Sequence, residues 1–498
     1  MFRNRFFKRN YSKRLSQKIS PLIWGNELYF SNSFLEDKIF KFLNIKHQFK
    51  TEIDWNYNQY GKLWTYNLNY FDFLNQKEMT KSIGVSLIED FIKNDLVLKD
   101  AKEPYPTSLR TINWVKFLSK NSISNASINQ YLYNHYQILL YNLEYHLLGN
   151  HLLENAFSLF FGGYYFSDTV LSKKAESLLR AELSEQLLED GAHFELSPMY
   201  HQILLHRLLD CINLAEKNKK ESESEFVVFL KDKALKMLAW LETITFNNGS
   251  IPMVNDSAYQ IAMPSQQLFK YAKRLNLQWS KVKLSDSGYR KFTMQNSEIF
   301  MDVGQLGVSY QLGHAHADTF NFIFYENNQP IIVDTGVSTY EINDTRESER
   351  STASHNTITI NDLNSSQVWS GFRVSKRAKV NLSIDSEFVV EASHNGCENL
   401  KHNRLFSVDN NIFTIEDKVP SNVEAKAYLH LHPDCKLNID KHKSKLFVND
   451  VEISFKGENT IELEDYKFAN GFNTTVSAKK VVVLFSENLE TNIKVMQK

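Results

Sequence analysis

The heptapeptide GNHLLEN, residues 149–155, places polar side chains in an otherwise apolar stretch. On a helix, Asn150 and Glu154 share a face, and so do His151 and Asn155, because each pair is four residues apart. An amide, an imidazole and a carboxylate would then lie within about one and a half turns, where they can hydrogen-bond a ligand or exchange a proton. An amphipathic helix whose polar stripe faces water is the alternative that this pattern leaves open.

The stretch DGAHFELSPMYH, residues 190–201, carries a second candidate group. A capping hydroxyl at Ser197 followed by proline predicts a helix that begins at Pro198. Tyr200 would then lie in the first turn, where unpaired backbone N–H groups and the helix dipole favour negative charge. We expect this position to lower the pKa of Tyr200 from ~10 towards a value useful for proton transfer. A half-buried structural tyrosine is the alternative.

Histidines cluster in LGHAHADTFNF, residues 312–322. On a strand, His314, His316 and Asp318 would point to one side, because side chains alternate. Ligation of a zinc ion would satisfy such a cluster, and its spacing alone does not distinguish this from other arrangements. Nitrogen and oxygen ligands are available from this segment, from PIIVDTG and from TASHNT: His316, Asp334 and His355.

Arginines and aromatic residues supply candidate substrate contacts. Arg346 and Arg350 lie in NDTRESERSTASHNT, and Arg110 precedes Asn113 and Trp114 in RTINWVKF. Guanidinium groups bind carboxylates and sulfates through paired hydrogen bonds. Ion pairs with the adjacent glutamates on the surface are the alternative for the first two. The aromatic segment would line a sugar-stacking wall or pack between helices.

Two regions with different hydrophobic patterns must position these groups. Apolar residues recur at helical spacing from about residue 32 to 278, as in SPMYHQILLHRLLDCINLAEK, and Gly191 is expected to stop the helix before it. After about residue 286 the chain alternates in short β-branched and aromatic segments such as PIIVDTG and KVVVLFS. No long helices intervene there to form parallel crossovers. The sequence therefore predicts a basic segment (1–31), a helical domain (32–285) and an antiparallel β-sandwich (286–498).

Composition narrows the function classes. The 498 residues exceed one ordinary core, and 57 Lys and Arg balance 58 Asp and Glu, which gives no sign of a nucleic-acid partner. Three scattered cysteines imply no disulfide framework. The N-terminal MFRNRFFKRNYSKRLSQK lacks the apolar run of a secretory signal, and no stretch of ~18 apolar residues predicts a membrane span. We expect a cytoplasmic protein, with a periplasmic or membrane-surface location as the alternative.

These stretches occur together and in this order. On GNHLLEN, HFELSPMYH, GHAHAD and VDTG followed by SHNT, the sequence from about Leu63 to Arg373 resembles the heparinase II/III family of polysaccharide lyases. The resemblance implies an incomplete (α/α) toroid followed by an antiparallel β-sandwich, with the active site between them. It also implies cleavage of an acidic, uronic-acid glycan such as heparan sulfate by β-elimination, which leaves a 4,5-unsaturated uronate.

The resemblance further implies roles for individual residues. Asn150 matches the asparagine that neutralises the substrate carboxylate, with His151 and Glu154 as the histidine and glutamate of the same helix. Tyr200 matches the catalytic tyrosine and His314 a second catalytic histidine. The proposed zinc ligands match a structural site, and the first two are 18 residues apart, as in the family. Whether Tyr200 or a histidine removes the C5 proton stays open.

Two other classes of function remain as rivals. A non-catalytic glycan-binding protein, or a protein of capsule or exopolysaccharide biosynthesis, would keep the fold without requiring proton-transfer groups. A metal-dependent hydrolase built on the HAHAD cluster would release saturated products. An unsaturated product distinguishes a lyase from both.

Overall fold

A computed structural model describes residues 11, 13–15, 19–25, 28–218, 224–440 and 445–496. Much of the predicted N-terminal segment, 1–31, lies outside this range. The chain forms two compact units, and the first comprises Met1–Leu187, Gln202–Leu238 and Gln266–Trp279. The second comprises Leu188–His201, Ala239–Ser265 and Ser280–Lys498. Unlike the predicted domains, these units are not continuous in sequence.

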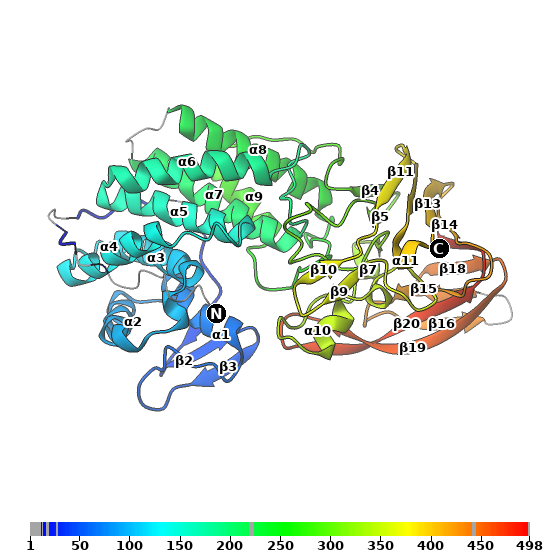
Figure 1. Ribbon diagram of the computed structural model, residues 1–498, viewed down its shortest axis with the longest axis horizontal. Helices are drawn as coiled ribbons and strands as arrows, with labels where there is room; N and C mark the ends of the chain where they lie inside the picture. The colour runs from blue at the N-terminus through cyan, green and yellow to red at the C-terminus, as the bar shows by residue number, and fades with distance from the viewer. Residues whose placement is uncertain are drawn as a thin grey trace. The chain divides into compact units, whose positions relative to one another are not determined.

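Helices dominate the first unit (Figure 1). In order they are α1 (Lys62–Tyr70), α2 (Lys81–Lys93), α3 (Pro104–Lys120), α4 (Ala126–Tyr141), α5 (Gly149–Phe166), α6 (Thr169–Gln186), most of α7 (Pro198–Asn218) and α8 (Glu225–Ile244), and α9 (Ser265–Arg274). Short 3-10 turns follow α1 and α2: η2 (Asp72–Asn75), η3 (Asp95–Val97) and η4 (Asp100–Lys102).

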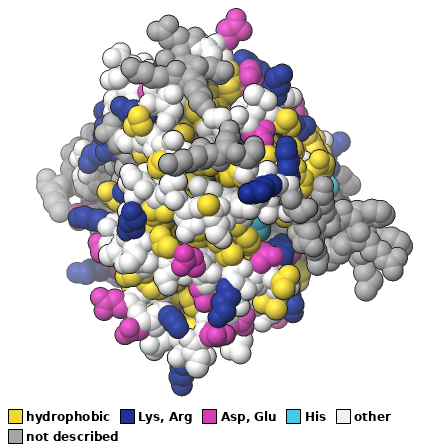
Figure 2. Space-filling model, turned by 90° about the vertical axis from the view of Figure 1, so that its left-hand side faces the viewer, with side chains coloured by type: hydrophobic (Ala, Val, Ile, Leu, Met, Phe, Trp, Pro, Cys, Tyr) yellow, Lys and Arg dark blue, Asp and Glu magenta, His cyan; other side chains and the backbone are white. Residues whose placement is uncertain are grey.

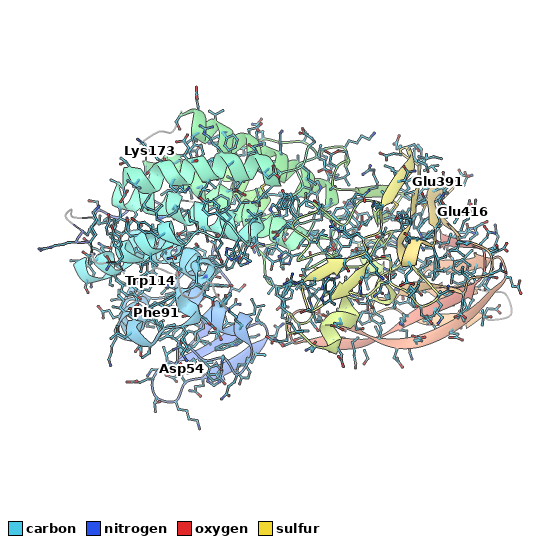
Figure 3. The ribbon with its side chains drawn as sticks, viewed as in Figure 1. Asp54, Phe91, Trp114, Lys173, Glu391 and Glu416 are labelled. Atoms are coloured by element: carbon cyan, nitrogen blue, oxygen red, sulfur yellow. The ribbon has the colours of Figure 1, made fainter. Side chains whose placement is uncertain are left out.

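Side-chain caps and close packing explain where these helices begin and how they fit. The Asn125 carboxamide oxygen accepts hydrogen bonds from the first turn of α4, and Asp168 does the same for α6. Phe91 of α2 and Trp114 of α3 pack with ring centroids 5.8 Å apart (Figure 3). Helix α6 ends at Gln186, before the expected stop at Gly191, which instead adopts φ 91° in the following turn.

A small sheet interrupts the predicted helical domain. Strands β1 (Phe34–Leu35), β2 (Ile39–Phe42) and β3 (Ile45–Gln48) pair in antiparallel order. The two turns that join them place pairs of residues at positive φ: Asp37 with Lys38, and Leu43 with Asn44. Strands this short contain too few residues for a period of two to stand out, so the prediction of helix from residue 32 is wrong here.

The second unit is rich in strands. They are β4 (Tyr289–Met294), β5 (Ser297–Asp302), β6 (Phe322–Glu326), β7 (Gln329–Ile332), β8 (Ile358–Ile360), β9 (Gln367–Trp369), β10 (Arg373–Ser375), β11 (Val380–Asp385), β12 (Val389–His394), β13 (His402–Asp409), β14 (Ile412–Lys418), β15 (Ala425–His430), β16 (Leu437–Asp440), β17 (Lys445–Val448), β18 (Val451–Lys456), β19 (Asn459–Ala469), β20 (Thr475–Phe485) and β21 (Asn488–Val495). Short helical turns are α10 (Asp344–Glu349), η5 (Thr352–Ser354) and α11 (Gly396–Asn399).

Most of these strands pair antiparallel in three large sheets: an eight-stranded sheet ordered β11-β12-β13-β14-β21-β18-β17-β16 and two four-stranded sheets, β19-β20-β15-β8 and β4-β5-β6-β7. Strands β9 and β10 pair separately as an antiparallel hairpin. One buried cluster draws apolar residues from all three sheets. Phe413 of β14, for example, packs on Phe322 of β6 with ring centroids 5.7 Å apart. The prediction of a helical region followed by an antiparallel β-sandwich is confirmed.

The surface fits the balanced composition. On the face shown in Figure 2, cationic and anionic side chains are interspersed among hydrophobic ones. Among the helices in the described part of the chain, none is both long enough and apolar enough to cross a membrane.

Candidate active site

Tyr200 and His314 lie against each other in the second unit. Their rings are tilted by 32°, with centroids 4.2 Å apart. Tyr200 is the third residue of α7, and its backbone N–H donates to Ser197 Oγ at 3.3 Å, which confirms the predicted cap and the start at Pro198. The structure thus brings together a phenol and an imidazole that lie 114 residues apart in the sequence (314 − 200 = 114).

The surroundings of Tyr200 favour the neutral phenol. Burial raises the pKa of Tyr200 above its ordinary value of 10, and the nearby carboxylates of Asp256 and Glu195 raise it further. The Tyr340 hydroxyl, 3.4 Å from the Tyr200 hydroxyl, and the Arg346 guanidinium oppose this effect without overcoming it. The expectation of a lowered pKa is therefore wrong, because burial and two carboxylates raise the pKa of Tyr200.

His314 and His316 belong to a loop between β5 and β6, so the predicted strand at 312–322 is wrong for most of its length. Turns at residues 309–310, 313–314 and 319–320 break the alternation on which that prediction depended. The two histidines nevertheless converge, because both contact the carboxylate of Asp256. His314 Nδ1 lies 2.8 Å from Oδ2, and His316 Nε2 lies 2.9 Å from Oδ1.

Asp256 is the central residue that the sequence analysis missed. It is fully buried, and the Arg346 guanidinium contacts both of its oxygens, at 2.6 and 2.7 Å. Burial alone would raise the pKa of the Asp256 carboxyl, but Arg346, His314 and His316 outweigh burial and hold the pKa well below its usual range. Because a carboxylate only accepts hydrogen bonds, His314 Nδ1 and His316 Nε2 must each carry a hydrogen.

No sequence signal marks Asp256. It lies in the short segment VNDS, where Asn255 adopts φ 52° and the Asp256 backbone N–H donates to the His314 carbonyl at 3.1 Å. An aspartate beside Asn and Ser is typical of an exposed turn, so burial at this position becomes visible only in three dimensions.

Arg346 and Arg350, predicted to bind substrate, are both buried. Besides Asp256, Arg346 donates from Nε to the Gly371 carbonyl at 3.1 Å. Arg350 donates to the carbonyl of Ala315, between the two histidines, at 2.8 Å. The alternative of surface ion pairs is wrong for both, and these contacts favour a supporting role behind the His314 loop.

In the first unit, GNHLLEN forms the start of α5, as predicted. Only His151 in this stretch is partly exposed, so the alternative of a polar stripe facing water is wrong. Glu144, which the sequence analysis missed, joins the group: its carboxylate lies 3.2 Å from His151 Nδ1 and accepts a 3.0 Å hydrogen bond from Asn155. Asn150 is buried on the same helix as His151 and Asn155.

Glu154 points into the first unit and pairs with Arg207 of α7, whose Nε lies 3.3 Å from both carboxylate oxygens. Burial raises the pKa of Glu154, and the Arg207 charge reduces but does not cancel this shift. The structure does not support the predicted contact of Glu154 with substrate, because the side chain is fully buried.

Three further predicted substrate contacts lie inside the first unit. Arg110, Asn113 and Trp114 are all buried in α3. Arg110 donates to the Ala101 carbonyl at 2.9 Å, and Asn113 donates to the Tyr70 carbonyl at 2.9 Å. For this segment the structure favours helix packing over a sugar-stacking wall.

The predicted zinc ligands fit the ion in chemical type. His355 Nδ1 lies 2.8 Å from Asp334 Oδ2, and the rings of His316 and His355 are 5.3 Å apart. His316 Nδ1 and His355 Nε2 are buried without a hydrogen-bond partner, which is the condition of nitrogen atoms that a metal would satisfy. Within the described ranges, however, no three His, Cys, Asp or Glu side chains are already spaced as a group that could hold a metal. Zinc therefore stays a prediction.

Comparisons with known proteins place this geometry in context. Residues 106–279 match the family model "Heparinase II/III N-terminus", and residues 277–496 match "Heparinase II/III-like, C-terminal". A heparin-sulfate lyase of Bacteroides stercoris is 24% identical in an alignment of length 350 that covers 64% of this chain and 51% of the relative. A heparin-sulfate lyase of Pedobacter heparinus is 23% identical in an alignment of length 423 that covers 78% of this chain and 61% of the relative. The chain thus spans about half to three fifths of the length of these curated relatives, 51% and 61%.

Solved structures agree on the fold. The crystal structure of heparinase III superposes with a TM-score of 0.72 at 18% identity, covering 93% of this chain and 82% of the other. With both regions matched in order and the predicted toroid-plus-sandwich architecture shared, the chain belongs to the heparinase II/III family.

Proposed function

We propose that this protein is a polysaccharide lyase that cleaves uronic-acid glycans of the heparan sulfate type, or a related acidic polysaccharide, by β-elimination. One observation carries the proposal: a phenol and an imidazole are in direct contact, and a buried carboxylate fixes the far side of the imidazole. Binding alone does not require such a proton-transfer pair. The names of the curated relatives support the same class of reaction.

The reaction removes the proton at C5 of a uronic acid and expels the glycosidic oxygen from C4. The adjacent carboxylate makes the C5 proton very weakly acidic, so its charge must be neutralised first. The resemblance assigns this task to Asn150, and the partly exposed His151 is suited to assist it. Glu144, beside His151, would orient that imidazole.

The second unit supplies the proton-transfer groups. Because Asp256 holds the hydrogen on Nδ1 of His314, Nε2 is the ring nitrogen able to accept the C5 proton. The raised pKa of Tyr200 keeps its phenol protonated at neutral pH, which suits donation to the leaving oxygen at C4. The C5–H and C4–O bonds break, a C4–C5 double bond forms, and the expelled oxygen leaves as a hydroxyl.

A zinc ion held by His316, Asp334 and His355 forms part of the proposal as a structural group. It would tie the loop of His316 to the segments that carry Asp334 and His355. Removing the metal should lower the melting temperature of the protein. Elemental analysis of the purified protein, with thermal melting before and after chelation, measures both effects. A metal-free protein with unchanged melting would contradict the zinc assignment.

Ultraviolet absorbance of the unsaturated uronate tests the reaction. The purified protein is incubated with heparan sulfate, heparin, hyaluronan, chondroitin and alginate in turn. We expect a rise with a sulfated member of this panel. Cleavage seen by mass spectrometry without a rise would favour the hydrolase, and no cleavage of any member would favour the binding or biosynthetic protein.

A further inference from the structure

The hairpin of β9 and β10 is labelled in Figure 1. This hairpin and the segment after it are rich in cationic residues. Four exposed cations lie within seven residues: Arg373, Lys376, Arg377 and Lys379. No acidic residue occurs from Leu363 to Ile384. Because six residue steps span at most about 20 Å, the four charges are close together. In a chain with a net charge of only −1, this is a local concentration.

Two exposed aromatic residues accompany the cations. Trp369 is 41% exposed and Phe372 is 39% exposed. Trp369 lies directly opposite Arg373 in the antiparallel pair, so the two side chains share the outer face of the hairpin. Val368 and Val374 form the next pair and point to the other face. An indole beside a guanidinium offers a flat surface for a sugar ring and a fork for its sulfate or carboxylate.

The inner face of this segment is attached to the loop of the candidate site. Val374 and Ala378 pack with Ala315, which lies between His314 and His316 in the sequence. The buried Arg350 guanidinium donates both to the Ala315 carbonyl, at 2.8 Å, and to the Arg373 carbonyl, at 3.4 Å. One arginine thus fixes the backbone of the cationic segment to the backbone of the histidine loop.

Phe372 marks the point where the segment meets the candidate catalytic pair. Its ring centroid lies 6.3 Å from that of His314 and 5.4 Å from that of Tyr340, whose hydroxyl contacts Tyr200. A glycan cleaved beside His314 would therefore meet this aromatic ring first and the cations next.

The protein itself uses little of this charge. Lys376 pairs with Glu398 at 3.6 Å, but both side chains are more than 60% exposed, at 68% and 63%, and such pairs are weak. Arg377 donates one hydrogen bond to the Ser309 carbonyl. Two exposed acidic residues, Asp344 and Glu347, lie on the neighbouring α10. The excess of positive charge is therefore in the part of the segment that follows Arg373.

We propose that residues 369–379, here named the docking strip, bind the part of the glycan next to the cleavage site and select a sulfated chain over an unsulfated one. A chain with a single carboxylate per disaccharide offers fewer charges than four clustered cations can pair with, whereas a sulfated chain supplies several. This inference rests on the proposed function, since it takes the His314 region as the place of cleavage.

Direct binding tests the docking strip without turnover. In a Tyr200→Phe background, the strip variant carries Arg373→Gln, Lys376→Gln, Arg377→Gln and Lys379→Gln. A matched control replaces four exposed lysines of the first unit with glutamine: Lys41, Lys46, Lys50 and Lys81. Calorimetry then measures binding of heparan sulfate oligosaccharides and of the same oligosaccharides after chemical desulfation, at several salt concentrations.

We expect the strip variant to bind the sulfated oligosaccharide about ten-fold more weakly, equivalent to about 1.4 kcal/mol, and with a shallower salt dependence. The affinity of the control should stay within about two-fold of the background protein, a difference of at most roughly 0.4 kcal/mol by the same conversion. Trp369→Ala should weaken both oligosaccharides, because stacking does not depend on sulfate. Circular dichroism and thermal melting verify that each variant is folded.

Equal affinity of the background protein for sulfated and desulfated chains would overturn the proposal, as would equal losses in the strip variant and the control. Because binding is read without cleavage, these outcomes are separate from the fate of the proposed lyase. A protein that binds as expected but yields no unsaturated product would refute the lyase and retain the strip.

Discussion

The carboxylate of Asp256 lies 2.6 and 2.7 Å from two nitrogens of the Arg346 guanidinium, and both side chains are completely buried. The same carboxylate accepts hydrogen bonds from His314 and His316. One ion pair in the interior of the second unit therefore fixes both imidazoles. Its integrity should matter for stability and activity together.

Replacing Asp256 with asparagine should destabilise the protein by about 3–5 kcal/mol, because the Arg346 charge would remain buried without its counter-charge. Urea unfolding measures this loss. Adding Arg346→Met to the same protein should restore part of the stability while leaving lyase activity low, since His314 still lacks its partner. A double variant no more stable than Asp256→Asn would contradict this account of the pair.

Tyr200→Phe should abolish formation of the unsaturated product and change the free energy of unfolding by less than about 1 kcal/mol. The hydroxyl makes a long 3.4 Å contact with Tyr340, so little native hydrogen bonding is lost. Tyr340→Phe is the matched control, because it removes the other end of this contact and keeps the Tyr200 hydroxyl. Product formation by Tyr200→Phe at the rate of the parent would refute the proposed acid.

Stability in acid should depend on Asp417 of the sandwich. Burial alone would raise the pKa of Asp417, but the Arg404 charge and the His402 hydrogen bond lower it to about 2. A carboxyl group whose pKa is lower in the folded state stabilises the fold at pH values above its unfolded-state pKa, near 3.8. This contribution is lost as the pH falls through the folded-state pKa of about 2. The contribution is about 2 kcal/mol. Between pH 4 and 2, about the interval set by these two pKa values, the free energy of unfolding of Asp417→Asn should depend less steeply on pH than that of the parent. The exposed Asp409→Asn should behave like the parent.

Two glycines with opposite surroundings give a packing test. A Cβ atom added to Gly84 in α2 would lie 2.2 Å from the Phe117 ring, whereas one added to Gly313 meets nothing within 4 Å. Gly84→Ala should therefore cost about 1–3 kcal/mol through overpacking, despite the higher helix propensity of alanine. Gly313→Ala should stay within about 0.5 kcal/mol. Equal melting temperatures for the two variants would contradict the packing seen around Phe117.

The sequence predicts best where a local signal determines local structure. Ser197 before Pro198 specifies a cap and a helix start, and the structure has both. The switch from helical to alternating periodicity separates the helices ending with α9 from the strands beginning with β4. Such signals depend only on residues close in the sequence, so they can be interpreted without knowledge of the tertiary fold.

Features set by long-range contacts were not predictable in this way. Asp256 contacts groups that are 58, 60 and 90 residues away in the sequence. The segment VNDS contains no pattern that predicts these contacts. The pKa of Tyr200 was assigned the wrong direction because the helix terminus is visible in the sequence and the buried carboxylates are not. Arg346 and Arg350 look like surface residues among glutamates, yet the fold buries both.

The discontinuous path of the chain limits how this protein can be divided. Tyr200 and Asp256 belong to the second unit although both precede residue 280, because segments 188–201 and 239–265 leave the helical region to join it. A fragment cut where the two family regions meet, near residues 277–279, would carry His314 without the aspartate that orients it and without the tyrosine that lies against it. The two halves are therefore not interchangeable modules, because exchanging one half between relatives would pair His314 with a tyrosine and an aspartate from a different protein.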